Sequence, residues 1–214
     1  MPSEDLLNLL ANLNRTDKTD IVIISGRGKK DLEDWLGNTP VNLTAEQGCW
    51  IREALQREWK LFKPLSNEWK KEVLPIMEMY TDRLPGAYLE ERDYSISWHY
   101  HKADIEQATF LAKEVGDHLL SITTNIGVQV LPGHRVIEVS NSGINKGELA
   151  MHWLSRKDYD FVMAIGAGWS DEMLFQTLPA HAWSVRVGLL ITSAKFVLKS
   201  QSDALEMLKL LEKH

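Results

Sequence analysis

The feature that most constrains the fold is an alternation of short apolar runs with amphipathic segments at both ends of the 214-residue chain. "IVIIS" (21–25) is rich in β-branched residues, ends at glycines, and precedes a helix-like segment at 29–37. The same order recurs in "DFVMAIG" (160–166) and "SDEMLFQTL" (170–178). Because neighbouring parallel strands are joined by helical crossovers and buried on both faces, this pattern predicts an α/β fold with a parallel sheet.

Further segments extend the same pattern at each end of the chain. The predicted elements are a helix at 4–13, a strand at 41–45, a helix at 145–154, strands at 182–188 and 196–200, and a closing helix at 202–213. The two ends of the chain are therefore expected to form one core domain.

The middle of the chain does not continue the alternation of strands and helices. The predicted elements are helices at 67–85 and 104–125, a hairpin formed by 87–92 and 94–100, and two strands around a Pro-Gly turn within 128–140. Residues 49–62 are compatible with either a hairpin or a helix. We therefore predict an inserted α+β domain at 47–140, between core segments 1–46 and 141–214.

Composition excludes several classes of protein. The net charge of −6 and the isoelectric point near 5.7 argue against a general nucleic-acid binder. No apolar run approaches about 18 residues and the first residues lack a basic start, so we expect no membrane span and no signal peptide. A single cysteine, Cys49, cannot form an internal disulfide and fits a reducing, cytoplasmic location, with Cys49 itself a small buried residue.

Three loops carry residues suited to binding an anion or a metal. Ser25 follows a strand and precedes a helix, where its hydroxyl and the free N–H groups suit a phosphate oxygen, although an ordinary turn has the same sequence. Lys146 lies in the first turn of a predicted helix, where the helix dipole favours a negative charge and disfavours a lysine. Either a bound phosphate or exposure of the lysine to solvent would account for its position. The third loop, Gly166-Ala167-Gly168, offers no side chain that binds a metal or moves a proton.

Five segments in this order and spacing resemble the trehalose-6-phosphate phosphatases of the haloacid dehalogenase (HAD) superfamily. They are "VIISGR" (22–27), "AEQGCWIR" (45–52), "LPIMEMYTDRLPGAYLEERDYSISWHY" (74–100), "VIEVSNSGINKG" (136–147) and "AIGAGWSDEMLF" (164–175). The resemblance covers nearly the whole chain. It implies a HAD-like core with an inserted cap that reads the sugar, and it is greatest for the phosphatase half of fused synthase/phosphatase proteins.

The resemblance also implies a reaction and a set of residues. In the family an aspartate on the first core strand attacks the phosphoryl group, and Mg²⁺ is held by that aspartate and by a later Gly-Asp-Asp loop. Ser25 and Lys146 match the residues that bind phosphate, and Asp171 matches the later acid of the fourth motif. The sugar-binding matches are Glu46, Glu90, Arg92 and Glu138, with Arg92 standing where a lysine is usual and Gln47 where a histidine is usual.

Two departures bear on activity. The Asp-x-Asp-Gly-Thr motif occurs nowhere in the 214 residues, and Ala167 occupies the position of the metal-binding aspartate. We therefore expect no intact catalytic or metal-binding set, weak or absent Mg²⁺ binding, and little or no phosphatase activity. The expected function is an impaired trehalose-phosphatase domain of trehalose biosynthesis or, alternatively, a non-catalytic module that binds trehalose 6-phosphate or a synthase partner.

Two further expectations remain open from the sequence. His99 and His101 alternate on a predicted strand and so share one face, which makes zinc conceivable, but no third ligand is near in sequence. The family's first strand lies between the strands at 21–25 and 160–166. Without it, these two strands pair directly, or another segment or chain fills the gap, which includes self-association.

Overall fold

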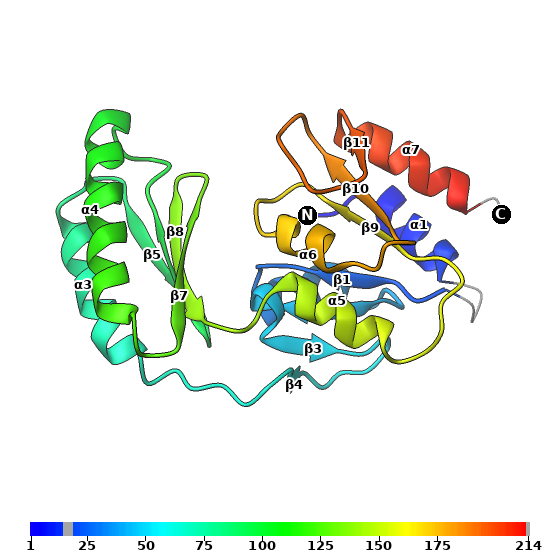
Figure 1. Cartoon of the computed structure of the whole chain (residues 1–214), viewed down its shortest axis with the longest axis horizontal. Helices are drawn as coiled ribbons and strands as arrows, with labels where there is room; N and C mark the ends of the chain where they lie inside the picture. Colours follow the sequence, from blue (N-terminus) through cyan, green and yellow to red (C-terminus); the bar gives the residue numbers. More distant parts are fainter. Residues whose placement is uncertain (15–18, 213–214) are drawn as a thin grey trace. The chain divides into compact units, whose positions relative to one another are not determined.

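A computed structural model describes residues 1–14 and 19–212 of the chain. The chain divides into two compact units, one formed by 1–62 with 144–214 and the other by 63–143 (Figure 1). The predicted mixed α/β fold is confirmed by the seven helices of the described residues and by strands in both units. The end of the predicted closing helix, at residue 213, lies outside the described residues.

The first unit contains both ends of the chain. Its elements are α1 (Glu4–Leu13), β1 (Val22–Ile24), α2 (Lys29–Leu36), β2 (Asn42–Ala45), the 3-10 turn η1 (Glu46–Gly48), β3 (Trp50–Arg52), β4 (Lys60–Leu61), α5 (Lys146–Leu154), β9 (Met163–Gly166), α6 (Asp171–Thr177), β10 (Trp183–Val187), β11 (Phe196–Leu198) and α7 (Gln201–Leu211). The strands form two sheets, ordered β1-β2-β3-β4 and β11-β10-β9.

Parallel pairing is present in both sheets of the first unit. β1 pairs with β2 in parallel, and β10 pairs in parallel with both β9 and β11. Within the described ranges β1 and β9 do not pair with each other. The alternative in which these two strands pair directly is therefore wrong.

The segment 49–62 forms strands, not a helix. β3 pairs antiparallel with β2, and β4 pairs antiparallel with β3, so hydrogen bonds attach this segment to the first sheet. The second compact unit begins at Lys63 and ends at Gly143. The domain boundaries at 47 and 140 remain predictions from the sequence.

Short polar side chains fix the starts of several helices. Ser3 accepts a hydrogen bond from the Leu6 N–H at the start of α1, and Asn145 accepts one from the Glu148 N–H at the start of α5. Ser200 and Asp203 form a reciprocal capping box at the start of α7. These caps satisfy N–H groups that the helices leave without an internal partner.

Apolar residues of the two units form separate cores. In the first unit, Leu32, Val41 and Leu43 are buried between α2 and the first sheet. Cys49 is 2% exposed, which confirms its prediction as a small buried residue. No helix in the described ranges is both long and apolar enough to cross a lipid bilayer.

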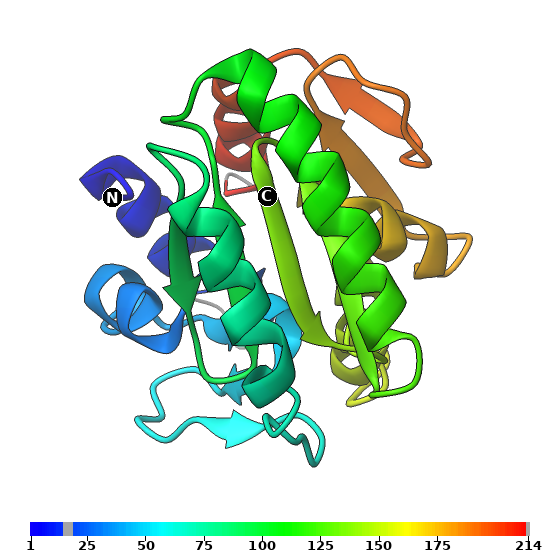
Figure 2. The same cartoon turned by 90° about the vertical axis from the view of Figure 1, so that its left-hand side faces the viewer.

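The second unit is a four-stranded antiparallel sheet with two helices. Its elements are α3 (Lys70–Asp82), β5 (Tyr88–Glu91), β6 (Ser95–His99), α4 (Ile105–Thr123), β7 (Val128–Gly133) and β8 (Val136–Asn141), with strand order β5-β6-β8-β7. Both helices lie on one face of the sheet, where Ile96, Trp98 and Val139 are fully buried (Figure 2). The predicted hairpin of 87–92 and 94–100 is confirmed.

The turn between β7 and β8 lies later than the sequence suggested. Pro132 and Gly133 remain in the strand, opposite Ile137 and Val136, and the turn is formed by the two residues that follow, ending at Arg135 with φ of 57°. β7 is an edge strand, so Pro132 loses no ladder hydrogen bond by lacking an N–H.

Candidate functional site

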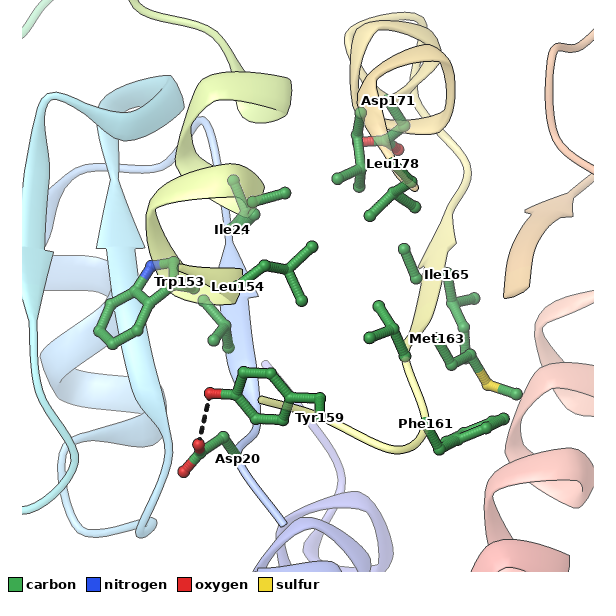
Figure 3. A pocket seen from close by; sticks show the side chains of 15 residues that line it. Asp20, Ile24, Trp153, Leu154, Tyr159, Phe161, Met163, Ile165, Asp171 and Leu178 are labelled. Atoms are coloured by element: carbon green, nitrogen blue, oxygen red, sulfur yellow. Dashed lines mark hydrogen bonds between the residues drawn. The ribbon is translucent and has the colours of Figure 1, made fainter. Parts of the chain in front are cut away.

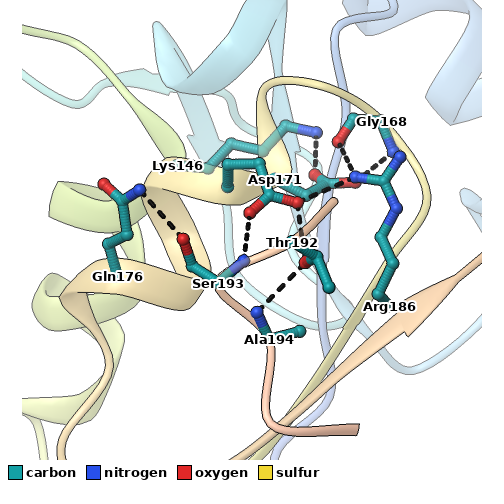
Figure 4. Close-up of polar contacts among 9 residues, drawn as sticks. Lys146, Gly168, Asp171, Gln176, Arg186, Thr192, Ser193 and Ala194 are labelled. Atoms are coloured by element: carbon teal, nitrogen blue, oxygen red, sulfur yellow. Dashed lines mark hydrogen bonds and ion pairs between the residues drawn. The ribbon is translucent and has the colours of Figure 1, made fainter. Parts of the chain in front are cut away.

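The loop between β9 and α6 holds a buried ion pair. Lys146, at the start of α5, places its Nζ 2.5 Å from Oδ1 of Asp171, and the Gly168 N–H donates to Oδ2 of Asp171 at 2.7 Å (Figure 4). Lys146 and Asp171 are 9% and 7% exposed. Both carboxylate oxygens are therefore engaged, and the two predicted residues are brought together.

The glycine before this loop is required by the close approach of Asp171. A Cβ atom at Gly166 would lie 2.5 Å from Oδ2 and 2.7 Å from Cβ of Asp171, which no side chain could accept without a shift. Ala167, which the sequence resemblance places at the metal-binding position, is exposed and presents only a methyl group. The loop therefore requires glycine at residue 166 and contributes no carboxylate at residue 167.

A second acid, Glu172, is held by a network that the sequence did not indicate. Its Oε1 accepts from Arg186 at 2.9 Å and from the Thr192 hydroxyl at 2.8 Å, and its Oε2 accepts from the Ser193 N–H at 2.7 Å (Figure 4). Arg186 also donates to the Gly168 carbonyl at 3.1 Å. Only the Asp-Glu pair at 171–172 hinted at this network, because its donors lie some 14 to 21 residues away along the chain.

These contacts shift the acid strength of Glu172. Burial by itself raises the pKa of Glu172, but the hydrogen bonds from Ser193 and Thr192 and the charge of Arg186 outweigh burial and lower the pKa below its ordinary value. Glu172 is therefore an ionised structural acid that ties α6 to the segment after β10.

The lowered pKa of Glu172 predicts acid-sensitive stability. With a folded-state pKa below the unfolded-state value of about 4.3, the carboxylate contributes stability above that value and loses it as pH falls through the folded-state pKa. Glu172→Gln should lower the melting temperature near neutral pH, and the gap from the wild type should narrow as the pH falls below about 4. Thermal denaturation across pH measures this, with the exposed Glu58→Gln as control. A gap that stays constant down to the acid range would contradict the assignment.

The loop after β1 carries Ser25 and lies beside Glu46. The Ser25 hydroxyl accepts from the Arg27 N–H at 3.1 Å, while the Ser25 and Arg27 carbonyls accept from the Gln47 and Glu46 N–H groups at 3.0 and 2.9 Å. Glu46 and Gln47 both adopt positive φ, 51° and 57°, a strained conformation typical of functional turns. No hydrogen bond within the described ranges joins Ser25 to Lys146 or Asp171.

Glu46 belongs to the first unit, whereas the other three sugar-binding candidates belong to the second. Glu90, Ser97 and Glu138 lie directly opposite one another on β5, β6 and β8, so their side chains share one face of the sheet. This is the face opposite α3 and α4, because Ile96 and Trp98 point into the core.

Charged and aromatic side chains extend this row of residues. Glu90 pairs with Arg92 at 2.7 Å and with Nε2 of His99 at 3.0 Å. The His99 ring stacks on Tyr88 with centroids 4.8 Å apart, and His101 meets Tyr88 edge-on. We call Tyr88, Glu90, Arg92, His99 and Glu138 the polar face of the second unit. Carboxylates accept hydrogen bonds from sugar hydroxyls. A flat ring beside them can pack against the apolar side of a sugar ring.

The sequence suggested a metal ion at two places, the strand with His99 and His101 and, through the family resemblance, the loop between β9 and α6. The described ranges contain no group of three or more His, Cys, Asp or Glu side chains arranged to hold a metal ion. At the β9–α6 loop, the oxygens of Asp171 and Glu172 already accept hydrogen bonds, and Ala167 offers none. A hard cation such as Mg²⁺ prefers several oxygen ligands, so the residues present do not fit it.

Comparison with known sequences relates the chain to trehalose metabolism. The family model for trehalose-phosphatase matches residues 1–209. The α,α-trehalose-phosphate synthase [UDP-forming] B of Dictyostelium discoideum is 35% identical over 216 residues, covering 99% of this chain and 27% of the relative. The bifunctional trehalose-6-phosphate synthase/phosphatase of Thermoproteus tenax is 35% identical over 196 residues, covering 92% and 27%. The chain thus spans about a quarter of the length of these relatives.

Solved structures agree with this relationship. The C-terminal domain of a C. albicans trehalose-6-phosphate phosphatase is 28% identical with a TM-score of 0.92, covering 100% of this chain and 84% of that one. The C-terminal domain of the Candida albicans trehalose synthase regulatory protein, 16% identical with a TM-score of 0.81, shares the fold. Given the family match over nearly every residue and these relatives, the chain belongs to the trehalose-phosphatase family.

Proposed function

We propose that the chain is a trehalose-phosphatase domain that binds trehalose 6-phosphate without hydrolysing it at a significant rate. One observation carries the proposal: at the end of β9, Ala167 supplies no carboxylate, and both oxygens of Asp171 are engaged by Lys146 and Gly168. The site therefore has no free acid to hold a magnesium ion. The Asp-x-Asp-Gly-Thr motif does not occur within these 214 residues, so they supply no aspartate in that motif.

The phosphate-binding part is proposed for the first unit. Ser25 carries a hydroxyl at the carboxyl end of β1, and Lys146 carries a positive charge at the start of α5. A phosphate would accept hydrogen bonds from these groups and from N–H groups of the adjacent turns. Because Lys146 already pairs with Asp171, its ammonium group would be shared between the Asp171 carboxylate and the phosphate.

The sugar-binding part is proposed for the polar face of the second unit. Glu90 is oriented by Arg92 and His99, and Glu138 lies in the same row of the sheet. Carboxylates accept hydrogen bonds from sugar hydroxyls, and the Tyr88–His99 stack offers a flat surface beside them. Glu46, which the sequence also suggested for this role, lies in the first unit and is proposed to shape the Ser25 turn.

Isothermal titration calorimetry tests the proposed function. We expect trehalose 6-phosphate to bind equally well with EDTA and with Mg²⁺, since no protein group is available to the metal. Glu90→Gln should weaken binding by about tenfold, the loss expected for hydrogen bonds to a charged group. Glu91→Gln is the matched control, because Glu91 is the next residue along β5 and faces the opposite side.

Separate ligands distinguish the two parts of the proposal. Glu90→Gln and Glu138→Gln should weaken binding of free trehalose and leave inorganic phosphate binding unchanged. Ser25→Ala should do the reverse. Absence of binding of all three ligands, or binding that requires Mg²⁺, would contradict the proposed function.

A second proposed function is support of a trehalose-phosphate synthase. The relatives named as synthases are about four times as long as the stretch they share with this chain. A chain of this family could therefore act on a synthase partner. Co-purification with a trehalose-phosphate synthase, together with a change in its rate, is the result that this function requires.

A further inference from the structure

The loop between β10 and β11 presents three consecutive aliphatic side chains to solvent. Leu189 and Leu190 are 75% and 68% exposed, and Ile191 is fully exposed. Single exposed apolar residues are common on protein surfaces, whereas a run of three is unusual unless it serves a function. We call these three residues the apolar tip.

Hydrogen bonds hold the chain on both sides of the apolar tip. Before the tip, the Gly188 N–H donates to the Leu198 carbonyl of β11 at 2.8 Å. After the tip, the Thr192 hydroxyl and the Ser193 N–H donate to Glu172 of α6 at 2.8 and 2.7 Å (Figure 4). The tip is therefore fixed at both ends, and fixed groups lose less conformational entropy when they bind a partner.

Two further features restrict the loop. Gly188 adopts φ of 102°, a conformation that favours glycine, and its carbonyl accepts from the Leu190 N–H at 3.2 Å. At the far end of the loop, the Lys195 N–H donates to the Ser184 hydroxyl of β10 at 3.0 Å. The exposure of the apolar tip thus results from a defined turn in an anchored loop.

The apolar tip offers no free charge to a ligand. Between Arg186 and Lys195 the sequence contains no charged residue. Arg186 pairs with Glu172 at 2.9 Å, and the Lys195 ammonium group donates to the Ala182 carbonyl at 2.7 Å. Nucleic acids and anionic lipid surfaces are bound largely through free lysine and arginine side chains, so this surface favours an apolar protein surface instead.

The apolar tip is separate from the apolar groove of the first unit. That groove has a volume of about 220 Å³ and lies between β1 and β9, with Ile24 and Ile165 on opposite sides (Figure 3). The family resemblance already accounts for the groove, because it places the family's first strand between β1 and β9. The apolar tip follows β10 and has no such explanation.

The relatives indicate which kind of polypeptide could cover the tip. The D. discoideum and T. tenax relatives, both named as synthases, match this chain over only 27% of their own length. The two solved C. albicans relatives are C-terminal domains. In such proteins a domain of this family belongs to a longer polypeptide, which brings further folded surface next to it.

We propose that the apolar tip docks into an apolar socket on a trehalose-phosphate synthase polypeptide. The inference rests on the second proposed function, support of a synthase, and assigns a surface to it. Docking would remove the three side chains of the tip from water, and the hydrogen bonds to Glu172 would hold them in position.

Biolayer interferometry with the trehalose-phosphate synthase of the same organism tests the proposal. We expect the wild-type chain to bind saturably, and Leu190→Asp and Ile191→Asp to bind at least about tenfold more weakly, because each places a charge in the apolar contact. Leu55→Asp is the matched control. Leu55 is 73% exposed in the same unit, outside the apolar tip, and its substitution should leave binding unchanged.

Four outcomes would overturn the proposal, and they have different meanings. Unchanged binding by Ile191→Asp would show that the tip is not the docking surface, while the synthase function itself would stand. Absence of binding by the wild type would reject both. A fall in the melting temperature of Leu190→Asp by more than about 4 °C would show that the tip packs within this chain. Co-sedimentation with phosphatidylserine vesicles that is lost in Ile191→Asp would assign the tip to a lipid surface.

Discussion

Purified chain incubated with trehalose 6-phosphate and Mg²⁺ is expected to release no phosphate above the uncatalysed background. Removal of a covalent nucleophile alone costs on the order of 10⁴–10⁶ in rate. Asp158-Tyr159-Asp160 does not replace it, because these residues precede β9, whereas Asp171 follows that strand. The two acids thus lie at the opposite end of the strand from the Lys146–Asp171 pair.

A malachite-green phosphate assay measures this outcome, with an active trehalose phosphatase as positive control. Ala167→Asp should remain inactive, because a restored metal ligand does not supply an attacking carboxylate. Phosphate release that co-purifies with the chain and disappears in Asp171→Asn would show that the site is catalytic after all.

Sequence periodicity predicted the elements that depend on local pattern. The strand at 21–25 and the long helix at 104–125 follow from continuous or amphipathic apolar spacing, and both are present as β1 and α4. The segment 49–62 could not be assigned, because its strands depend on pairing with β2 instead of on their own composition. Pro132 suggested a turn, but its tolerance in β7 depends on the strand being at an edge.

Sequence motifs predicted a contact of the candidate site only where both contacting residues belong to a motif. The pairing of Lys146 with Asp171 joins two residues that the family resemblance singled out separately. The network around Glu172 was missed because Arg186, Thr192 and Ser193 converge only after β10 and its following loop have folded. The alternation of His99 and His101 makes zinc conceivable from the sequence, whereas in the structure His99 Nε2 lies 3.0 Å from Oε2 of Glu90.

Breaking the Lys146–Asp171 pair is expected to cause a large loss of stability. Both side chains are about nine-tenths buried, so Lys146→Met would leave the Asp171 carboxylate without its charged partner. Removing one partner of a buried ion pair costs about 3–5 kcal/mol, because the remaining charge is desolvated without compensation. The exposed pair of Lys157 and Asp20 provides the control, for which Lys157→Met should cost about 1 kcal/mol or less.

Urea unfolding of the single and double variants separates the charge effect from the loss of packing. Replacing both residues, as Lys146→Met with Asp171→Leu, should recover much of the lost stability, since no unpaired charge then remains. Recovery will be incomplete, because Asp171 also accepts the Gly168 N–H and holds the loop after β9. If Lys146→Met costs no more than Lys157→Met, the Asp171 carboxylate does not depend on Lys146 for its stability, and the prediction is wrong.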